Sequence, residues 1–408
     1  MSGTGVVNRL VLVPARDAYD MTRWGAAAAN YRRAFGEVIF ARDPYAIALD
    51  EFERVTVVDP DFWPGDVMAY LRQQAPRIKV EVIFAPTPEV LAEILNARAF
   101  FASSYQVAPE QVPQPTPNPE LTGLWPRGVC LIGLHGRADG ELQDADFSVY
   151  DTARIEAAKL TSHATEQSVS RLLEINPRMF IMVRAISGFS DLNGQPRRIS
   201  PEDFAGSTIP DLARLVDGRR VWDIEIHNEP NLTQEGLGGS WNNGREFADW
   251  WLKARDVLRQ TFPFARFGFP GLSNGFGVPG VRYDGDQFLN EAEAAVREAD
   301  WIGIHSYWVV GGMTDPNQGF EYLRYRGRYP DKLLYITEFN TATYAKNDQA
   351  QQYAQYYAML RHEAGLGAAF SYVVSTSYLD ESHKFAWRGE DGSDVGIAAV
   401  IGARNYVG

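Results

Sequence analysis

The sequence of 408 residues contains a single cysteine, no long apolar run and no excess of basic residues. Because Cys130 has no partner cysteine, no intrachain disulfide can form, and neither a CxxC pair nor a Cys/His zinc spacing exists. No run of about 18 apolar residues occurs, so a contact with a membrane is not expected. The formal net charge of −13 argues against broad phosphate binding, and nucleic acid is therefore not an expected partner.

Signals for export and for nucleotide cofactors are also absent. The first residues, MSGTGVVNRLVLVPARD, contain no basic segment followed by a long apolar segment, so the chain as given is expected to be cytoplasmic. Neither a GxGxxG fingerprint after a strand nor a P-loop lysine is present. No cofactor is expected from these motifs.

What remains is the composition of a globular protein, with 45% hydrophobic and 22% charged residues. Over residues 8–98, runs rich in Val and Ile alternate with amphipathic segments, a pattern typical of parallel βα units. Residues 1–98 are therefore predicted to form a small three-layer α/β domain with a parallel sheet. In the absence of a nucleotide motif we interpret it as a structural or interaction module, which a protein partner would bind.

Residues 99–127 have the composition of a linker. Six prolines occur between Pro109 and Pro126, and prolines at this density exclude a regular helix and favour extended chain. We predict a domain boundary in this proline-rich stretch.

The rest of the chain, residues 128–408, again alternates strand-like and helix-like patterns. Helical patterns occur at 165–175, 245–260, 286–299 and 347–364. The eight strand candidates are residues 128–136, 157–163, 179–187, 221–230, 266–274, 300–308, 332–340 and 368–377. Eight βα repeats in this length predict a (β/α)8 TIM barrel.

Polar side chains occur where the predicted barrel strands end, which is where functional groups lie in such barrels. This set comprises His135, His163, Arg184, Glu229, Asn274, His305, Tyr307 and Glu338. Their shared position predicts one site at the C-terminal rim. Arg184, late on an inner strand, is expected to pair with Glu225 or to hold Glu338 ionised, because a buried arginine needs carboxylate partners.

Two carboxylates on one rim, Glu229 and Glu338, suit glycoside hydrolysis, which needs one carboxylic acid and one carboxylate. Asn228 is expected to hydrogen-bond a sugar 2-hydroxyl, and Tyr307 to orient Glu338. Because side chains alternate along a strand, Asn228 and Glu229 reach the same substrate only if the strand bends or bulges at its end. Sugar rings stack on indoles, and the tryptophans expected in rim loops are Trp308, Trp241 and Trp387.

These residues resemble a known group, the retaining glycoside hydrolases of clan A. EIHNEPNL at residues 225–232 and YITEFN at 335–340 look like the forms in families five and thirty-nine, and HSY at 305–307 is similar to the family-five arrangement. The resemblance covers residues 128–408. It implies that Glu229 is the acid/base, that Glu338 is the nucleophile, and that the substrate is an oligosaccharide or polysaccharide.

Two other interpretations stay open at this point. A metal-dependent barrel of the amidohydrolase kind would need an HxH pair after the first barrel strand, and LHGRADG offers only His135, so no metal is expected. A carbohydrate-binding or scaffold barrel without activity has mild support from the fused α/β domain. The presence of both glutamates favours the enzyme.

Overall fold

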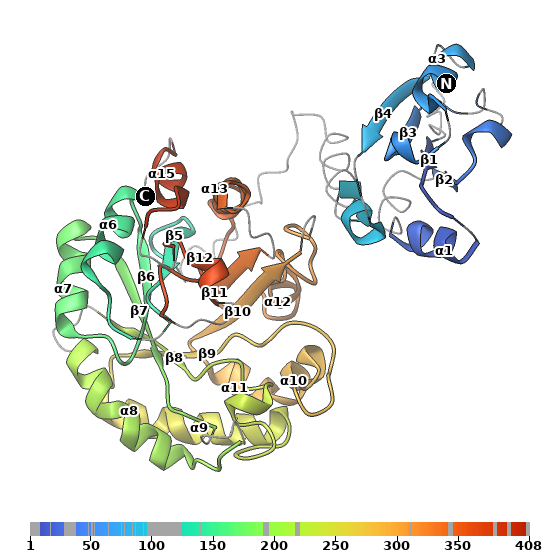
Figure 1. The fold of residues 1–408 in the computed structure, drawn as a ribbon. Coiled ribbons are helices and arrows are strands. Elements are labelled where there is room, and N and C mark those ends of the chain that lie inside the picture. The colour runs from blue at the N-terminus through green and yellow to red at the C-terminus, as the bar shows by residue number, and fades with distance from the viewer. Residues whose placement is uncertain are drawn as a thin grey trace, which may run out of the picture. The chain divides into compact units, whose positions relative to one another are not determined.

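The structure is a computed structural model, which describes residues 9–95 and 125–404 apart from short gaps. The gaps are 17, 28–37, 48, 50–51, 53, 64, 75, 77, 84, 86, 93, 139, 191–195, 217–220, 310–311, 342–345, 378–381 and 390–392. The chain folds into two compact units, a small α/β unit and a barrel (Figure 1). The predicted linker at 99–127 lies almost wholly outside the described residues, so the predicted domain limits stay predictions.

The small unit contains a four-stranded sheet in the order β2-β1-β3-β4, with every neighbouring pair parallel. The strands are β1 (Arg9–Leu12), β2 (Val38–Ala41), β3 (Arg54–Val58) and β4 (Lys79–Ile83). The helices are α1 (Ala18–Ala26) and α3 (Val67–Gln74), with 3-10 turns η1 (Pro44–Ala46) and η3 (Pro60–Phe62). The parallel sheet predicted from the Val- and Ile-rich runs is confirmed.

Both faces of this sheet carry buried apolar side chains. Leu10 and Leu12 pack in one core cluster with Val67 of α3, whereas Val11 packs in a second cluster with Trp24 of α1. A sheet whose two faces each meet a helix is a three-layer arrangement, as the sequence predicts.

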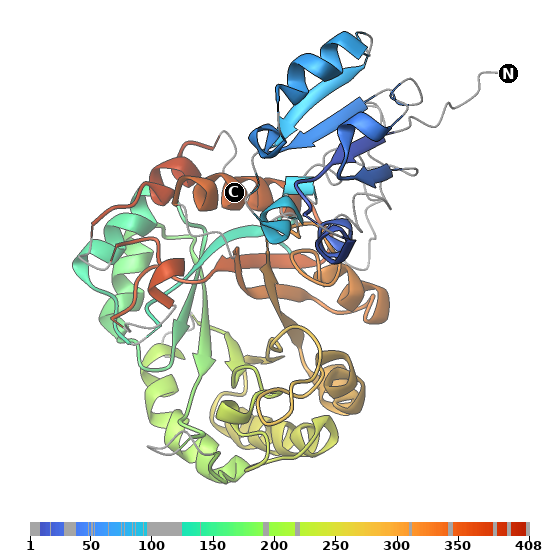
Figure 2. The same cartoon turned by 45° about the vertical axis from the view of Figure 1, so that its right-hand side comes forward.

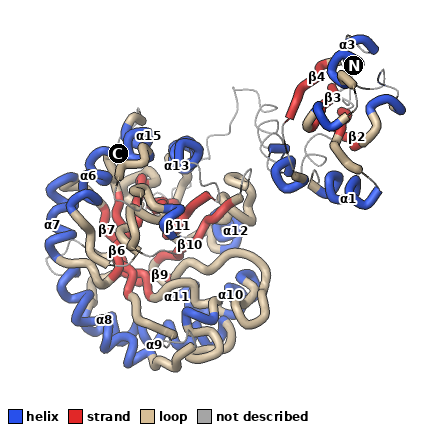
Figure 3. Tube along the Cα trace, in the orientation of Figure 1, coloured by secondary structure: helices blue, strands red, loops and turns tan. Residues whose placement is uncertain are grey.

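The larger unit is a closed barrel of eight parallel strands in sequence order, surrounded by helices (Figures 2 and 3). The strands are β5 (Leu131–His135), β6 (Ala157–Thr161), β7 (Phe180–Ala185), β8 (Asp223–Ile226), β9 (Arg266–Phe269), β10 (Trp301–Trp308), β11 (Leu334–Thr341) and β12 (Leu366–Ser371). The helices are α6 (Asp144–Thr152), α7 (Glu166–Ile175), α8 (Pro201–Val216), α9 (Gly244–Thr261), α10 (Gly285–Glu291), α11 (Glu293–Glu298), α12 (Tyr322–Arg328), α13 (Lys346–Leu360), α14 (Ser382–Phe385) and α15 (Ile397–Gly402), with η5 (Thr233–Glu235). The predicted (β/α)8 barrel is confirmed.

Each predicted barrel strand overlaps an observed one, but several ends differ: β11 continues to Thr341, and β12 runs from Leu366 to Ser371 where 368–377 was predicted. The strand predicted over 221–230 is shorter, because β8 ends at Ile226 and the polar run after it leaves the sheet. The helix predicted over 286–299 is two helices, α10 and α11, which meet at Ala292. None of the helices in the described ranges is both long and apolar enough to cross a membrane.

Aromatic rings fill the barrel near the N-terminal ends of its strands. Phe180, Trp301, Tyr335 and Phe370 belong to one buried cluster, and Trp301 stands edge-on to Tyr335 with ring centres 5.0 Å apart. Gly268 on β9 makes room for this layer, since a Cβ built there would lie 2.2 Å from the Trp301 ring. Large rings packed against small residues thus fill the part of the barrel near the N-terminal ends of its strands, which we call the floor of the barrel.

We predict that Gly268→Ala lowers the free energy of unfolding by about 1–3 kcal/mol, because the added methyl overlaps the Trp301 indole. The matched control is Gly206→Ala within α8, where a Cβ meets nothing within 4 Å. The control should raise stability by about 0.4–1 kcal/mol. Urea titration of both variants measures the difference, and equal effects would contradict the packing described for the floor.

We also predict that a chain starting near residue 120 folds without residues 1–98, because the barrel has its own closed sheet and its own core. It should be monomeric and keep the circular dichroism expected of an α/β barrel. Aggregation of this shorter chain, with the full-length chain soluble under the same conditions, would show that the small unit completes the barrel.

Candidate active site

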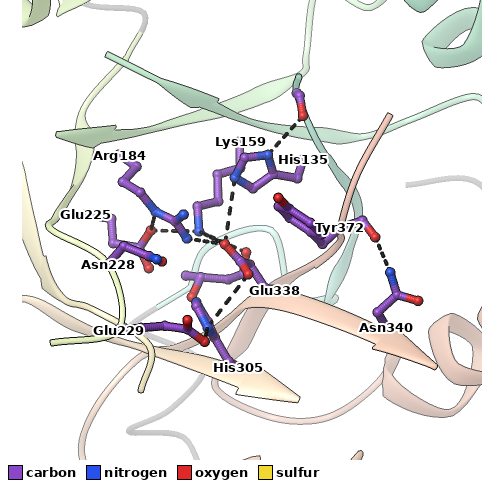
Figure 4. Close-up of polar contacts among 12 residues, drawn as sticks. His135, Lys159, Arg184, Glu225, Asn228, Glu229, His305, Glu338, Asn340 and Tyr372 are labelled. Carbon is purple, nitrogen blue, oxygen red and sulfur yellow. Dashed lines mark hydrogen bonds and ion pairs between the residues drawn. The ribbon is translucent and has the colours of Figure 1, made fainter. Parts of the chain in front are cut away.

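Polar side chains from six barrel strands, or from the residue segments that follow them, meet at the C-terminal ends of the strands (Figure 4). His135 ends β5, and Lys159, Arg184 and Glu225 lie on β6, β7 and β8. His305, Tyr307 and Glu338 lie on β10 and β11, while Asn228 and Glu229 directly follow β8. The site therefore lies where the barrel architecture places functional groups.

Glu338 is the most heavily contacted carboxylate of this group. Arg184 Nη2 donates to its Oε1, and the Tyr307 hydroxyl donates to its Oε2 at 2.7 Å. Lys159 Nζ lies 3.6 Å from Oε1, and His305 Nδ1 lies 3.7 Å from Oε2. Burial by itself raises the pKa of Glu338, but His305, Arg184 and Lys159 outweigh that effect and hold the pKa well below its usual range. Glu338 is therefore an ionised carboxylate at neutral pH.

Glu225 completes a buried ionic cluster beneath Glu338. Its Oε2 accepts from Lys159 Nζ at 2.7 Å and from Arg184 Nε at 2.8 Å. Burial raises the pKa of Glu225, yet the two cations lower it to about 2, whereas burial and the neighbouring Arg184 lower the pKa of Lys159 to about 8. Two positive and two negative groups then balance one another in the barrel interior. Arg184 contacts both Glu225 and Glu338, the two carboxylates predicted as its alternative partners.

A β-bulge turns Glu338 toward the inside of the barrel. Ile304 pairs with Ile336, but the next residue of β10, His305, pairs with Glu338, so β11 carries Thr337 as an extra residue. An extra residue reverses which side chains point to which face beyond it. Glu338 therefore lies beside His305, and the residue that follows it packs outward on aromatic rings of α13.

The backbone bends sharply after β8, as the predicted site required. β8 ends at Ile226, and His227 and Glu229 have left-handed φ angles of 78° and 35°. The amide of Glu229 donates to the carbonyl of Gly271 at 3.1 Å, which fixes the bent segment to the loop after β9. Non-glycine residues with such angles cost roughly 1–3 kcal/mol each and cluster at functional sites. The bend brings Asn228 and Glu229 to the same rim.

Glu229 and Glu338 share His305 as a neighbour. His305 Nδ1 lies 2.9 Å from Oε1 of Glu229 and 3.7 Å from Oε2 of Glu338, so these two oxygens are at most about 6.6 Å apart, the sum of the two distances. Gly271 allows this arrangement, because a Cβ there would lie 2.1 Å from the His305 ring. The side chain of Glu229 is 19% exposed and that of Glu338 only 6%. We call these two residues the carboxylate pair.

Asn228 is held by a glutamate that the sequence analysis did not select. Its Nδ2 donates to Oε1 of Glu235 at 3.0 Å, and its Oδ1 is buried with no hydrogen-bond partner among the described residues. Burial raises the pKa of Glu235 to about 7, although the hydrogen bond from Asn228 opposes this shift. The carbonyl of Glu235 also pairs with Nε2 of His227 at 2.7 Å. One short segment thus orients Asn228 and anchors the bent backbone.

His135 is neutral at physiological pH. Burial, together with the nearby Lys159 and Arg184, lowers the pKa of His135 to about 3. Its Nδ1 lies 3.0 Å from the carbonyl of Gly136, which suits a tautomer with the proton on Nδ1. Nε2 then carries a lone pair 3.9 Å from Glu338, and the ring of Tyr372 after β12 stands 5.2 Å from the His135 ring. Nε2 can accept a hydrogen bond from a hydroxyl group.

The structure does not bring the predicted tryptophans to the carboxylate pair. Trp308 was predicted in a rim loop, but it is the last residue of β10, 2% exposed, and its indole nitrogen donates to Gln352 at 2.8 Å. Since Tyr307 faces the barrel interior, strand alternation turns Trp308 outward. Trp241 is buried against His227 and donates to the carbonyl of Pro230 at 2.7 Å.

Trp387 and Asn274 are also not brought to the pair. Trp387 is fully buried, and its indole nitrogen donates to Ser371 at 2.9 Å. Asn274 lines a separate cavity in the loop after β9.

Lys159 is the main residue that the sequence analysis missed. It is fully buried, touches both Glu225 and Glu338, and its Nζ donates to the carbonyl of Thr337 at 3.0 Å. The signal was present, because a lysine in the middle of an apolar strand can stay buried only with carboxylate partners. Lys159 is the third residue of β6, whereas the residues predicted for the site lie at or near strand ends.

Within the described ranges, no group of three or more His, Cys, Asp or Glu side chains is placed to hold a metal ion. Lys159 and Arg184 put two positive charges against Glu338, where a cation would have to bind. The site is thus built of carboxylates with basic neighbours.

No protein-family model matches this sequence, and no curated protein matches it either. Among solved structures, it is similar to a GH128 (subgroup VI) exo-β-1,3-glucanase from Aureobasidium namibiae, with 13% identity, 65% of this chain and 94% of that chain covered, and a TM-score of 0.41. A glucosidase from Croceicoccus marinus has 16% identity, 67% of each chain covered and a TM-score of 0.49. A β-glucuronidase from Bacteroides uniformis has 12% identity and a TM-score of 0.49, and the match covers 69% of this chain and 36% of that chain. At these values the likenesses do not identify a reaction, and the barrel is established by its own strand order.

We predict that Lys159→Met lowers the free energy of unfolding by about 3–5 kcal/mol, because it leaves buried Glu225 with one cation in place of two. The double variant Lys159→Met with Glu225→Gln should recover part of this loss. As a control, Arg214→Met removes an exposed ion pair with Asp211 and should cost at most about 1 kcal/mol. Urea titration measures all three, and a cost for Lys159→Met no larger than the control's would contradict the buried cluster.

Proposed function

We propose that this protein is a glycoside hydrolase that cleaves β-linked sugars by a retaining, two-step mechanism. The observation that carries the proposal is the short separation of Glu229 and Glu338 around His305. Glu338 is kept ionised by His305, Arg184 and Lys159 and accepts a hydrogen bond from Tyr307. Two carboxyl groups about 5–5.5 Å apart serve a retaining reaction, whereas inverting enzymes separate them by about 6.5–9.5 Å to admit a water molecule. The upper limit of about 6.6 Å on the distance between Glu229 Oε1 and Glu338 Oε2, which follows from their distances to His305, lies at the bottom of the inverting range.

Glu338 is assigned as the nucleophile. Its carboxylate is buried and ionised, and Arg184 and Tyr307 hold its two oxygens in one orientation. A fixed, desolvated carboxylate attacks the anomeric carbon without first losing a shell of water. The product of this step is a covalent glycosyl–enzyme ester, and the bond to the leaving-group oxygen breaks as the ester forms.

Glu229 is assigned as the acid and then the base. Its side chain is more exposed than that of Glu338 and lies at the mouth of the site, where a leaving group and then a water molecule can reach it. In the first step its proton passes to the leaving oxygen, and in the second step it removes a proton from the water that attacks the ester. His305, 2.9 Å from Glu229, positions this carboxyl group.

A neutral, hydroxyl-rich substrate fits the groups around the pair. Lys159 and Arg184 are paired with Glu225 and Glu338, so these four described side chains carry no net charge that would attract an ionic substrate. The unpartnered Oδ1 of Asn228 suits a sugar 2-hydroxyl. The substrate is accordingly assigned as an oligosaccharide or polysaccharide. The small α/β unit is assigned a supporting or interaction role, and cytoplasmic location stays a prediction.

We predict that Glu229→Ala and Glu338→Ala both lose more than about 10³-fold in kcat/KM toward natural glycosides, since each removes one of two essential groups. With 2,4-dinitrophenyl β-glycosides and azide, Glu229→Ala should form a glycosyl azide of retained configuration, because the ester at Glu338 still forms. Glu338→Ala should form the inverted azide, since the small anion occupies the nucleophile's place. NMR of the products measures the configuration.

The matched control is Glu166→Gln in the first turn of α7, an exposed glutamate for which the described contacts give no role in the site. It should keep the activity of the unaltered chain. The proposal fails if a broad panel of aryl glycosides and polysaccharides is not cleaved, which would favour a carbohydrate-binding or scaffold barrel. The retaining assignment fails if Glu229→Ala with azide gives the inverted product.

A further inference from the structure

A cavity of about 150 Å³, separate from the carboxylate pair, lies beside the loops that leave β9 and β10. The loop after β9 forms one wall with Asn274 and Phe276, and the start of α12 forms another with Arg324 and with Glu321, the residue before the helix. These loops leave the same ends of the strands that carry the carboxylate pair. The volume is far above the roughly 10–15 Å³ that admits one water molecule, so a larger group can enter. We call this space the β9–β10 cavity.

Polar atoms in this cavity lack partners within the protein. Both side-chain amide atoms of Asn274, Nδ2 and Oδ1, are buried and make no hydrogen bond to any residue that the structure describes. The same is true of Oε2 of Glu321, whose residue is only 8% exposed. A buried polar atom without a partner costs about 1–3 kcal/mol. Three such atoms on two residues that line one cavity suit a ligand that supplies their hydrogen bonds.

The chemistry of these groups suits hydroxyls. The Asn274 amide both donates and accepts, and burial raises the pKa of Glu321 to about 8, so at neutral pH its carboxyl group also does both. Arg324 is neutralised by Asp286, and its Nη1 lies 3.9 Å from Glu321, so no free cation for an anionic ligand remains among the described residues that line the cavity. Neighbouring hydroxyls on a sugar ring are likewise donors and acceptors at once. Phe276, 85% exposed, presents a flat apolar ring at the same place.

One short segment connects this cavity to the carboxylate pair. Gly271 accepts a hydrogen bond from the amide of Glu229 and lies against the His305 ring. Asn274 is three residues further along, which places its Cα at most about 11 Å from that of Gly271. The amide of Ser273 donates to Oδ1 of Asn231 at 2.9 Å, so the segment is also fixed to the loop after β8. A substrate bound at the pair can therefore extend to Asn274.

We propose that the β9–β10 cavity binds a further sugar unit of the substrate, so that the enzyme recognises a chain of several sugars rather than a single glycoside. This inference rests on the function proposed above and assigns to it the length of its substrate. Asn274 and Glu321 contact hydroxyls of the remote sugar, and Phe276 packs on its C–H face. None of the three takes part in bond cleavage.

The test uses the full chain with Glu338→Gln, which binds without turnover, and isothermal titration calorimetry with β-1,3- and β-1,4-linked glucose, mannose and xylose trisaccharides. The best-bound trisaccharide is then compared with the methyl β-glycoside of its monosaccharide. Adding Asn274→Ala or Glu321→Leu should weaken the trisaccharide about 10-fold and leave the methyl glycoside unchanged. Glu321→Gln keeps a neutral donor and acceptor of the same shape, so it should retain trisaccharide binding. Gln260→Ala, exposed on α9, is the control.

The outcomes separate this inference from the proposed function. If Glu338→Gln binds no saccharide, both are overturned. If it binds the trisaccharide and neither Asn274→Ala nor Glu321→Leu changes the affinity, only the remote sugar site is overturned. An equal loss for the trisaccharide and the methyl glycoside also overturns it, because the change then acts on the site as a whole. A crystal structure with the trisaccharide that holds only water in the β9–β10 cavity would do the same.

Discussion

The guanidinium of Arg184 joins two carboxylates that would otherwise be buried without sufficient compensation. Its Nε donates to Glu225 and its Nη2 to Glu338, while Lys159 reaches both acids from the neighbouring strand. Removing two anions from water is expensive, and only closely placed cations with good geometry offset that cost. The barrel can therefore keep Glu338 ionised at a depth where a lone glutamate would take up a proton. Every chemical role assigned to the rim depends on this cluster.

The two glutamates of the carboxylate pair are aimed by irregular backbone on otherwise regular strands. Thr337 bulges out of the β10–β11 register, and left-handed residues bend the chain after β8. Both features leave the barrel wall intact below them, where apolar side chains fill the interior. Hydrogen bonds from the bent segment to Gly271 and from His227 to the carbonyl of Glu235 hold the bend in place. The strained segment is thus held by hydrogen bonds to the loop after β9 and to η5.

Much of this arrangement could be predicted, because the barrel pattern and the polar strand ends are local features of the sequence. Eight apolar runs separated by amphipathic segments predicted the strand order, and a buried arginine predicted its own carboxylate partners. The bend after β8 was predicted because side chains alternate along a strand, so Asn228 and Glu229 can reach one substrate only if the backbone bends. The prediction of Trp308 in a rim loop was wrong, although side-chain alternation also applies to it. Its neighbour Tyr307 faces inward, so Trp308 faces outward. The bulge at Thr337 had no sequence signal, because register depends on how two strands pack together.

The aromatic floor of the barrel has a consequence for the order of events above it. Phe180, Trp301, Tyr335 and Phe370 pack in the barrel beneath the charged layer, so molecules that enter or leave the site reach Glu338 from the rim. In the proposed two-step reaction, the leaving sugar and the incoming water would use the same route through the rim. Water would then reach the covalent ester only after the first product had moved aside. This arrangement would shield the covalent ester from water until the first product leaves. If a second sugar then arrived in place of water, the glycosyl group would be transferred to that sugar rather than hydrolysed.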